Sequence, residues 1–496
     1  MIRAFKLSPF VICTSVSLLV IGELVVGTSL YFTAMMAIAL LSIGVTYNLL
    51  GGLSSFSGII FTFFALCTIV ISQFAKVLLL EAADKNLEVP QLTISLYAVF
   101  YLSAMVGTFL FGKVRLRLPR PAESLTGAQT SLLYGIALSV GLVSTIVFET
   151  YVTNSAQSNY NSAQGAGLAF APLLLFSLVI AIDNRIKLTG GKHSVDLFVL
   201  IPAIALVLFG FFDTSRGGMI RPAVVYFFAC YCRGYRLAKR HYLVIASGIV
   251  LFFYFIAPLE LFTRSFTFDQ PLRARIYIAF HVLATHLDPT ELRNSANQAY
   301  QGGSSAREEY YSRPGTYVLS RLSLIRADSN LIEACSNGSH YGFASAKIAL
   351  LQNIPSFLYK GKRRDIGAGD YLASIVAGGD MESLQFPTFS AVADSYGAFG
   401  WLGVVLVPLF LFPMAFIVYE SIFDFSRPWG TVALGMLLLT FSETSFSGLL
   451  LLILRTPVYL VLLSYLVVGL VKMVPIRGDK ATGLRPGSPN LEESSL

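Results

Sequence analysis

Charged residues are scarce in this 496-residue chain, where they make up 13% of the total. A soluble globular protein carries roughly 25%. So few charges cannot cover the surface of a water-soluble protein of this size, which excludes a single soluble enzyme. The hydrophobic share of 55% and the mean hydropathy of +0.68 also exclude a largely disordered chain.

Residues that serve metal and redox chemistry are few as well. The chain has five cysteines and five histidines, and the histidines show no metal-ligand spacing on one helix. Cys230-x-Cys232 lacks the further ligands of a zinc site. Phosphate-binding loops, dinucleotide-binding glycine motifs and Gly-x-Ser-x-Gly elbows are absent from the sequence. We therefore predict structural cysteines, no metal and no cofactor.

Long apolar runs dominate what is present. A membrane-spanning helix needs about 20 mostly apolar residues. Runs of this kind lie at 9–30, 32–50, 54–79, 91–112, 128–150, 166–183, 194–212, 218–232, 241–259, 397–419, 429–446 and 448–471. The sequence predicts an all-α polytopic membrane protein with about 12 transmembrane helices.

Basic residues gather on one side of these runs. Arg3 and Lys6 precede the first run, and the loop at 113–120, on the same side, holds one lysine and three arginines. The loop at 151–164, on the other side, carries no charge. Because positive residues mark the cytoplasmic face, we expect both termini in the cytoplasm. The net charge of +8 is thereby explained by topology and does not indicate nucleic acid as a partner.

The runs divide the chain into four parts. Residues 1–259 hold the first nine helices, 260–396 form a large extracytoplasmic loop, 397–471 hold the last three helices, and 472–496 are predicted to be a disordered cytoplasmic tail. Loops longer than about 15 residues are usually functional. Apolar residues recur at three- and four-residue spacing at Leu272–Leu287 and Tyr317–Ala334, which predicts that the large loop is partly helical.

Two arginines flank a glycine pair between the seventh and eighth runs. Arg216 and Arg221 are predicted at the outer mouth of these helices, where guanidinium groups could hold a phosphate in a fixed fork. The alternative is that both side chains reach toward lipid headgroups.

The large loop carries a carboxylate beside two arginines, Arg321, Arg326 and Asp328. Arg321 and Asp328 are seven residues apart and would share one face of a helix. Asp328 could act as a general base. It could equally orient an arginine through an ion pair.

A second basic group follows an apolar stretch in the same loop. It includes Lys360 and Arg363 and could bind anionic lipid headgroups or a diphosphate. The alternative is a solvated run of charge.

The chain returns to the membrane through a polar segment with Asp394 and Tyr396. Asp394 could cap the tenth helix or bind a sugar hydroxyl. Gly397, Gly400 and Gly403 are expected on one helix face, where they would permit close packing.

One arginine, Arg455, lies inside the last apolar run. An arginine at the centre of a membrane costs about 2.5–3.5 kcal/mol on insertion scales. We expect Arg455 to face a polar cavity or to pair with Glu443 of the preceding run.

These features together resemble the bacterial O-antigen polymerases of the Wzy type, which are related in fold to the O-antigen ligases. The resemblance rests on the twelve runs, the loop between the ninth and tenth, Thr214-Ser-Arg216-Gly, and Asp394-Ser-Tyr396-Gly397-Ala-Phe-Gly400. It implies a GT-C-like membrane glycosyltransferase in the bacterial inner membrane. The implied substrate is an undecaprenyl-diphosphate-linked oligosaccharide on the periplasmic face, with membrane lipid and a chain-length regulator protein as partners.

The resemblance also implies roles for the candidate residues. The catalytic set is Arg216, Arg321, Arg326 and Asp328, in which the arginines stabilise charge on the leaving diphosphate. The set that binds diphosphate or glycan is Arg221, Lys360, Arg363, Asp394, Tyr396 and Arg455. An O-antigen ligase and a lipid-linked oligosaccharide flippase or other transporter remain as alternatives.

Overall fold

The structure is a computed structural model, and it describes most of the helical part of the chain. The described residues are 6–122, 127–152, 169–212, 216–256, 259, 263, 272–285, 311, 323–338, 340–354, 368–376, 389–424, 427–442 and 444–474. None of them lies in a β-strand. Of the predicted site residues, Arg321, Lys360 and Arg363 fall outside this part, as do residues 475–496 of the tail predicted at 472–496.

Seven helices are long and apolar enough to cross a membrane among the residues described. They are α1 (Pro9–Val26), α2 (Leu30–Leu49), Phe56–Leu78 across α3 (Phe56–Ala65) and α4 (Ile71–Leu78), α5 (Pro90–Phe111), Ala128–Thr150 within α6 (Gly127–Val152), α19 to α20 (Ala391–Ile422), and α22 to α23 (Phe446–Met473). A helical multi-pass membrane protein is thereby confirmed.

Shorter helices occupy the other predicted runs. They are α8 (Pro172–Leu188), α9 (Leu197–Phe212), α10 (Arg216–Cys232), α11 (Lys239–Leu251) and α21 (Pro428–Ser442). Each of the twelve apolar runs thus contains a helix, while a count of twelve membrane crossings stays a prediction.

The outer surface of the long helices is apolar. Phe10 and Val25 of α1 and Leu462 of α23 are largely exposed, and other exposed aliphatic side chains follow α6 and α9. Contiguous apolar surface of this kind is not stable in water. It indicates contact with lipid.

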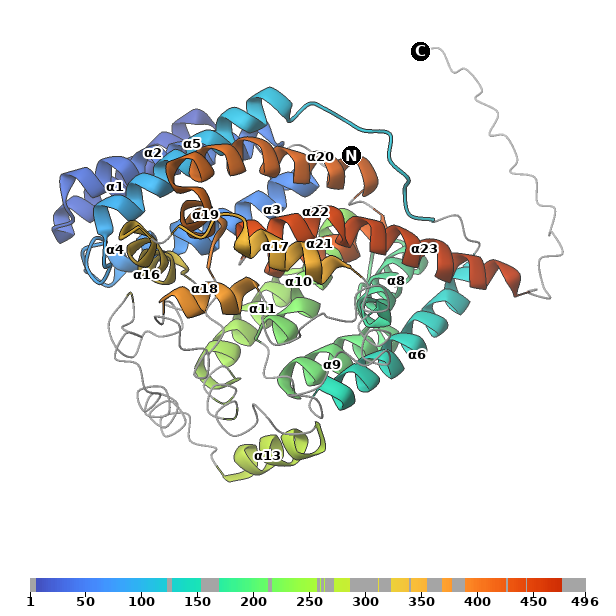
Figure 1. Cartoon of the computed structure of the whole chain (residues 1–496). Coiled ribbons are helices and arrows are strands. Elements are labelled where there is room, and N and C mark those ends of the chain that lie inside the picture. Colours follow the sequence, from blue (N-terminus) through green and yellow to red (C-terminus); the bar gives the residue numbers. More distant parts are fainter. Residues whose placement is uncertain are drawn as a thin grey trace, which may run out of the picture.

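The helices pack around an aromatic core. In Figure 1, α2 and α5 lie side by side, and α20 packs against α5. Phe64 of α3 stands edge-on to Phe412, at the start of α20 (Phe412–Ile422), with ring centroids 5.1 Å apart. Phe100 of α5 also stands edge-on to Phe412, at 5.4 Å. Edge-on pairs of buried rings add about 0.5–1.5 kcal/mol each beyond their burial, so this cluster fixes α3, α5 and α20 together.

The 260–396 segment contains four described helices. They are α13 (Leu272–Thr285), α16 (Ile325–Ser336), α17 (Ala344–Asn353) and α18 (Ala368–Val376). The first helix predicted from periodicity is confirmed, and the second is confirmed from Ile325 onward. All four are too short to span a bilayer.

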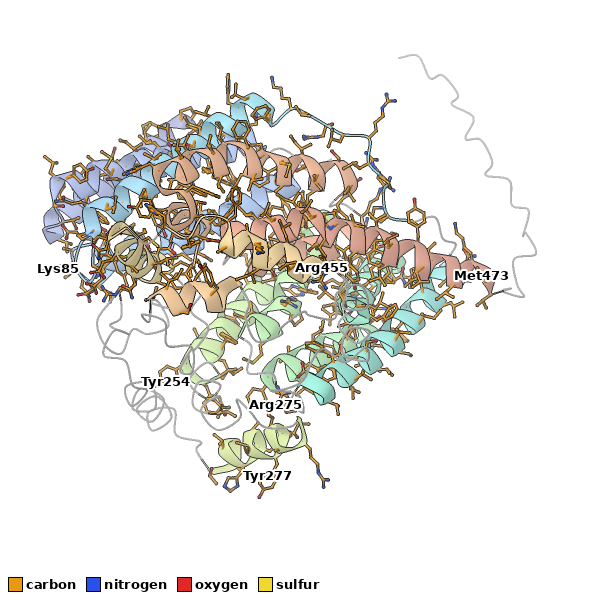
Figure 2. All side chains as sticks on the ribbon, in the orientation of Figure 1. Lys85, Tyr254, Arg275, Tyr277, Arg455 and Met473 are labelled. Carbon is orange, nitrogen blue, oxygen red and sulfur yellow. The ribbon has the colours of Figure 1, made fainter. Side chains whose placement is uncertain are left out.

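One side chain of this segment is inserted between α4 and the residues that follow it. Tyr311 is fully buried, donates a hydrogen bond to the carbonyl of Ala83 at 2.7 Å, and lies under the Lys76 ammonium at 4.4 Å. Lys76 in turn pairs with Glu81 at 3.1 Å. Tyr311 therefore anchors the segment at the end of α4. Lys85, which follows α4, is labelled in Figure 2.

Candidate functional site

Two fully buried aspartates mark the place where α16 and α17 meet the long helices. Asp328 lies in α16 and Asp394 in the first turn of α19 (Ala391–Leu406). Ser390 links them, because its amide donates to Asp328 Oδ1 at 2.8 Å and its carbonyl accepts from the Asp394 amide at 3.2 Å. We call these three residues and their hydrogen-bond donors the aspartate site.

Asp328 joins α16 to α5 and to the start of α19. Its Oδ2 accepts hydrogen bonds from the hydroxyls of Tyr97 and Ser390. A carboxylate with three donors is well satisfied at this depth. The described partners of Asp328 are thus hydroxyls and an amide. Arg321, expected on the same helix face, lies outside the described residues.

The neighbouring Ser329 contacts the residues just before α5. Its Oγ accepts from the amides of Glu88 and Val89, at 3.0 and 3.3 Å. Glu88 and Val89 directly precede α5, which begins at Pro90. Ser329 of α16 therefore fixes the segment that leads into α5.

Asp394 joins α17 to α19 and α22 (Phe446–Leu454). Its Oδ1 accepts from Tyr341 Oη at 2.7 Å and Ser345 Oγ at 3.1 Å. Its Oδ2 accepts from the amide and hydroxyl of Ser447, at 3.0 and 3.2 Å. Ser390, rather than Asp394, caps α19, because the Ser390 hydroxyl accepts from the Val392 amide. The expectation that Asp394 is a cap is wrong, since its carboxylate faces other helices.

Helix α19 breaks one turn after Asp394. Phe399 and Gly400 leave the helical conformation, and Gly400 has φ +62° and ψ −145°. The carbonyls of Gly397 and Ala398 accept hydrogen bonds from the amides of Tyr341 and Gly342, at 3.0 and 3.1 Å. The predicted single face of three glycines is wrong, because the helix is interrupted between Gly397 and Gly403.

We expect Gly400→Ala to lower stability and distort this break. The conformation of Gly400 is essentially restricted to glycine, and forcing another residue into it costs about 1–3 kcal/mol. Thermal unfolding of the purified protein in detergent should show a lower midpoint. Gly135→Ala is a matched control, because a Cβ there meets open space, and an equal loss in both variants would contradict the proposed strain.

Beside the break lies an exposed histidine. The imidazole of His340 stands edge-on to the Tyr396 ring, with centroids 5.4 Å apart. His340 is exposed and Tyr396 is buried. His340 is therefore a polar group that a ligand can reach next to the aspartate site.

The predicted arginines that the structure describes lie on several elements of the fold. Arg326 of α16 pairs with Glu88 at 2.9 Å and also donates to the carbonyl of Asn86. Arg455, which is labelled in Figure 2, lies at the turn between α22 and α23 (Thr456–Met473) and is exposed. Its predicted partner Glu443 lies outside the described residues. Arg326 is thus engaged by a protein carboxylate.

The remaining predicted arginines lie on α10. Arg216 begins this helix, and its side chain lies outside what the structure describes. Arg221 is half-buried one turn later. Convergence of Arg216, Arg321, Arg326 and Arg455 on one diphosphate therefore stays a prediction.

Burial controls the electrostatics of Asp328. Loss of solvent raises the pKa of its carboxyl from 3.8 to about 6, although the hydrogen bonds from Ser390 and Tyr97 act in the opposite direction. The nearby Asp394 raises this pKa further. The native protein therefore holds a proton on Asp328 more tightly than the unfolded chain does.

This shift predicts a pH dependence of stability. Because the folded pKa is above the unfolded one, the contribution of Asp328 is fully present below pH 4 and is lost as the pH rises through about 6. The loss is on the order of 3 kcal/mol. The unfolding midpoints of wild type and Asp328→Asn should therefore be closest at acidic pH. Between about pH 4 and 6, the wild-type midpoint should fall relative to that of Asp328→Asn, which has no carboxyl group to titrate at this position. Parallel profiles over that range would contradict the assignment.

Several residues of the site carry no signal that identifies them in advance. Tyr97 and Ser447 become hydrogen-bond donors to the aspartates only through tertiary packing. A weak signal exists for Tyr341 and Ser345, which are four residues apart and can face one partner. Among the described residues, no group of three or more histidine, cysteine or acidic side chains is placed to hold a metal ion.

Comparison with known proteins gives no relative for this chain. No protein-family model, no curated protein and no solved structure matches it.

Proposed function

We propose that this protein is a membrane glycosyltransferase that polymerises oligosaccharide repeat units carried on undecaprenyl diphosphate. A hydroxyl oxygen of one lipid-linked unit attacks the anomeric carbon of the other lipid-linked chain. A glycosidic bond forms, and the bond between that carbon and the diphosphate oxygen breaks. Undecaprenyl diphosphate leaves with the bonding electrons, and the hydroxyl proton passes to a base or to water.

The aspartate site is the observation that carries this proposal. It joins helices too short to span a membrane to the ends of long apolar helices, beside a break in α19. A lipid-linked sugar has the same division, with a tail that needs hydrocarbon and a head that needs polar groups. Irregular backbone at membrane depth is tolerated where it is buried in protein or lines a polar cavity.

The contacts support particular roles. Asp328 and Asp394 act as positioning residues, because both carboxylates are buried and satisfied by protein donors. His340 is exposed beside the buried Tyr396, so a glycan can approach its imidazole. The diphosphate is assigned to the cationic candidates, because arginines stabilise charge that develops on a leaving group. These are Arg216, Arg221, Arg321, Arg326, Lys360, Arg363 and Arg455.

The proposed location follows from the substrate. Both termini face the cytoplasm of a bacterial inner membrane, and the 260–396 segment faces the periplasm. A chain-length regulator is a proposed partner. Reporter fusions after Ser304 and after Arg485 should therefore give opposite signals, and the same signal from both would contradict this orientation.

A lipid-linked oligosaccharide flippase is the second candidate. Two observations favour it, namely the broken α19 and the buried charges of Glu23 and Lys76, because transporters use interrupted helices and intramembrane charges. An O-antigen ligase would use the same donor with a different acceptor.

Deletion of the gene separates these functions. A strain without a polymerase should still display surface glycan, with single repeat units in place of long chains. Loss of all surface glycan, single units included, would instead support a ligase or a flippase.

A further inference from the structure

Helix α13 of the 260–396 segment has two unlike faces. Arg275, Ala279 and Val282 are buried on one face. Tyr277 and Phe280 are 71% and 54% exposed on the other. In Figure 2, Arg275 points toward the helices above α13, and Tyr277 points away from them.

The buried face holds α13 at the ends of two apolar helices. Arg275 donates to Glu149 Oε2 at 3.0 Å, near the end of α6, and to the carbonyl of Phe212 at 3.2 Å, the last residue of α9. Phe280, although on the exposed face, also has its ring centroid 6.2 Å from that of Phe212. Helix α13 is therefore fixed where α6 and α9 leave their apolar surroundings.

The exposed face matches the chemistry of a membrane surface. Arg273, Tyr277, Phe280 and His281 recur at helical spacing and are all exposed, and the His281 ring stacks on that of Tyr277. Tyrosine is enriched where hydrocarbon meets headgroups, and cationic side chains beside aromatic ones are typical of helices that lie in this layer.

The apolar outer surface of α6 and α9 extends to the helix ends at which α13 is bound. Val143 and Ile146 of α6 and Leu208 of α9 are exposed apolar residues within the last two to three turns of their helices. Exposed aromatic rings next to such a surface would be costly in water, because each ring carries about 150–250 Å² of surface.

We propose that α13 is an interfacial helix that lies in the phospholipid headgroup layer. Tyr277 and Phe280 enter the boundary between headgroups and acyl chains, and Arg273 and His281 face lipid phosphates. The Arg275–Glu149 pair ties this helix to the span ends, so the helix holds the 260–396 segment against the membrane surface. The proposal depends on the membrane-spanning fold and is independent of the proposed reaction.

Quenching of tryptophan fluorescence by brominated lipid tests this placement. The chain has two tryptophans. Trp429 is buried and Trp401 is exposed, so Trp401→Phe leaves only a protected one. In that background, Tyr277→Trp is compared in lipid nanodiscs with Val143→Trp, a hydrocarbon reference, and with Glu333→Trp, an exposed position on α16. The nanodiscs contain phosphatidylcholine and phosphatidylglycerol, brominated either near the headgroup or near the acyl-chain midpoint.

The proposal predicts that Tyr277→Trp loses fluorescence to the bromine near the headgroup and less to the bromine at the midpoint. Quenching at position 277 as weak as at Glu333→Trp would show that water or other protein covers this face. Quenching strongest from the acyl-chain midpoint would place α13 in the hydrocarbon. Either result would overturn the proposal. All three variants add one surface tryptophan, so a loss of folding specific to position 277 is not expected.

Discussion

Asp394→Ala should unfold at a much lower denaturant concentration than the wild-type protein and should lose activity with it. The substitution removes the acceptor of Tyr341 Oη, Ser345 Oγ, and both the amide and hydroxyl of Ser447. A hydrogen bond to a charged group contributes about 1.5–3 kcal/mol, and a buried donor left without a partner costs more. The expected loss in the free energy of unfolding is therefore at least about 4 kcal/mol.

Two milder variants show whether the acceptor oxygens are the cause. In Asp394→Asn the oxygen toward Tyr341 and Ser345 can remain, but the new NH2 group meets the Ser447 amide, so about half of the effect should persist. Tyr341→Phe removes one donor and should cost roughly 1 kcal/mol. Denaturant unfolding in mixed micelles ranks the free energies of unfolding of these variants. If Asp394→Asn proved as stable as wild type, Asp394 would not hold α17 and α22 to α19.

Arg275→Met should have the second large effect. The guanidinium of Arg275 and the carboxylate of Glu149 are both buried and 3.0 Å apart. Removing one member of a buried ion pair typically costs about 3–5 kcal/mol, because the other charge stays buried without compensation. The same denaturation experiment measures the loss.

The double variant Arg275→Met with Glu149→Leu provides the control. It removes both charges, so its loss should be smaller than that of Arg275→Met alone. Glu149→Leu is also measured alone. If the loss in the double variant equalled the sum of the losses in the two single variants, the two charges would not interact energetically, contrary to the contacts.

Hydropathy alone located the helices of the membrane domain, because a span must be continuously apolar whatever its neighbours. The start of α19 was harder to predict from the sequence. The apolar run begins at residue 397, whereas the helix begins at Ala391 under the cap of Ser390. Burial of this first turn depends on α16 and α17, which no local pattern reveals.

The candidate site was predictable in its acidic residues and less so in its partners. Asp328 and Asp394 stand out because each is a carboxylate close to apolar sequence. The side chains that donate hydrogen bonds to them come from α5, α17 and α22, which are far away in the chain. Arg326 was predicted from charge alone, and its pairing with Glu88 depends on how α16 docks beside α5. Packing decides these pairings.

Reconstituted chain extension tests the proposed function most directly. Purified protein in lipid nanodiscs is supplied with one undecaprenyl-diphosphate-linked repeat unit as both donor and acceptor, and the products are separated by size. A polymerase should give a ladder of products that differ by one repeat unit, with release of undecaprenyl diphosphate. The ladder should be weaker for Arg216→Lys and still weaker for Arg216→Ala, because lysine keeps the charge but lacks the guanidinium fork. A folded wild-type protein that binds the lipid-linked unit but never lengthens it would contradict the proposed polymerase function.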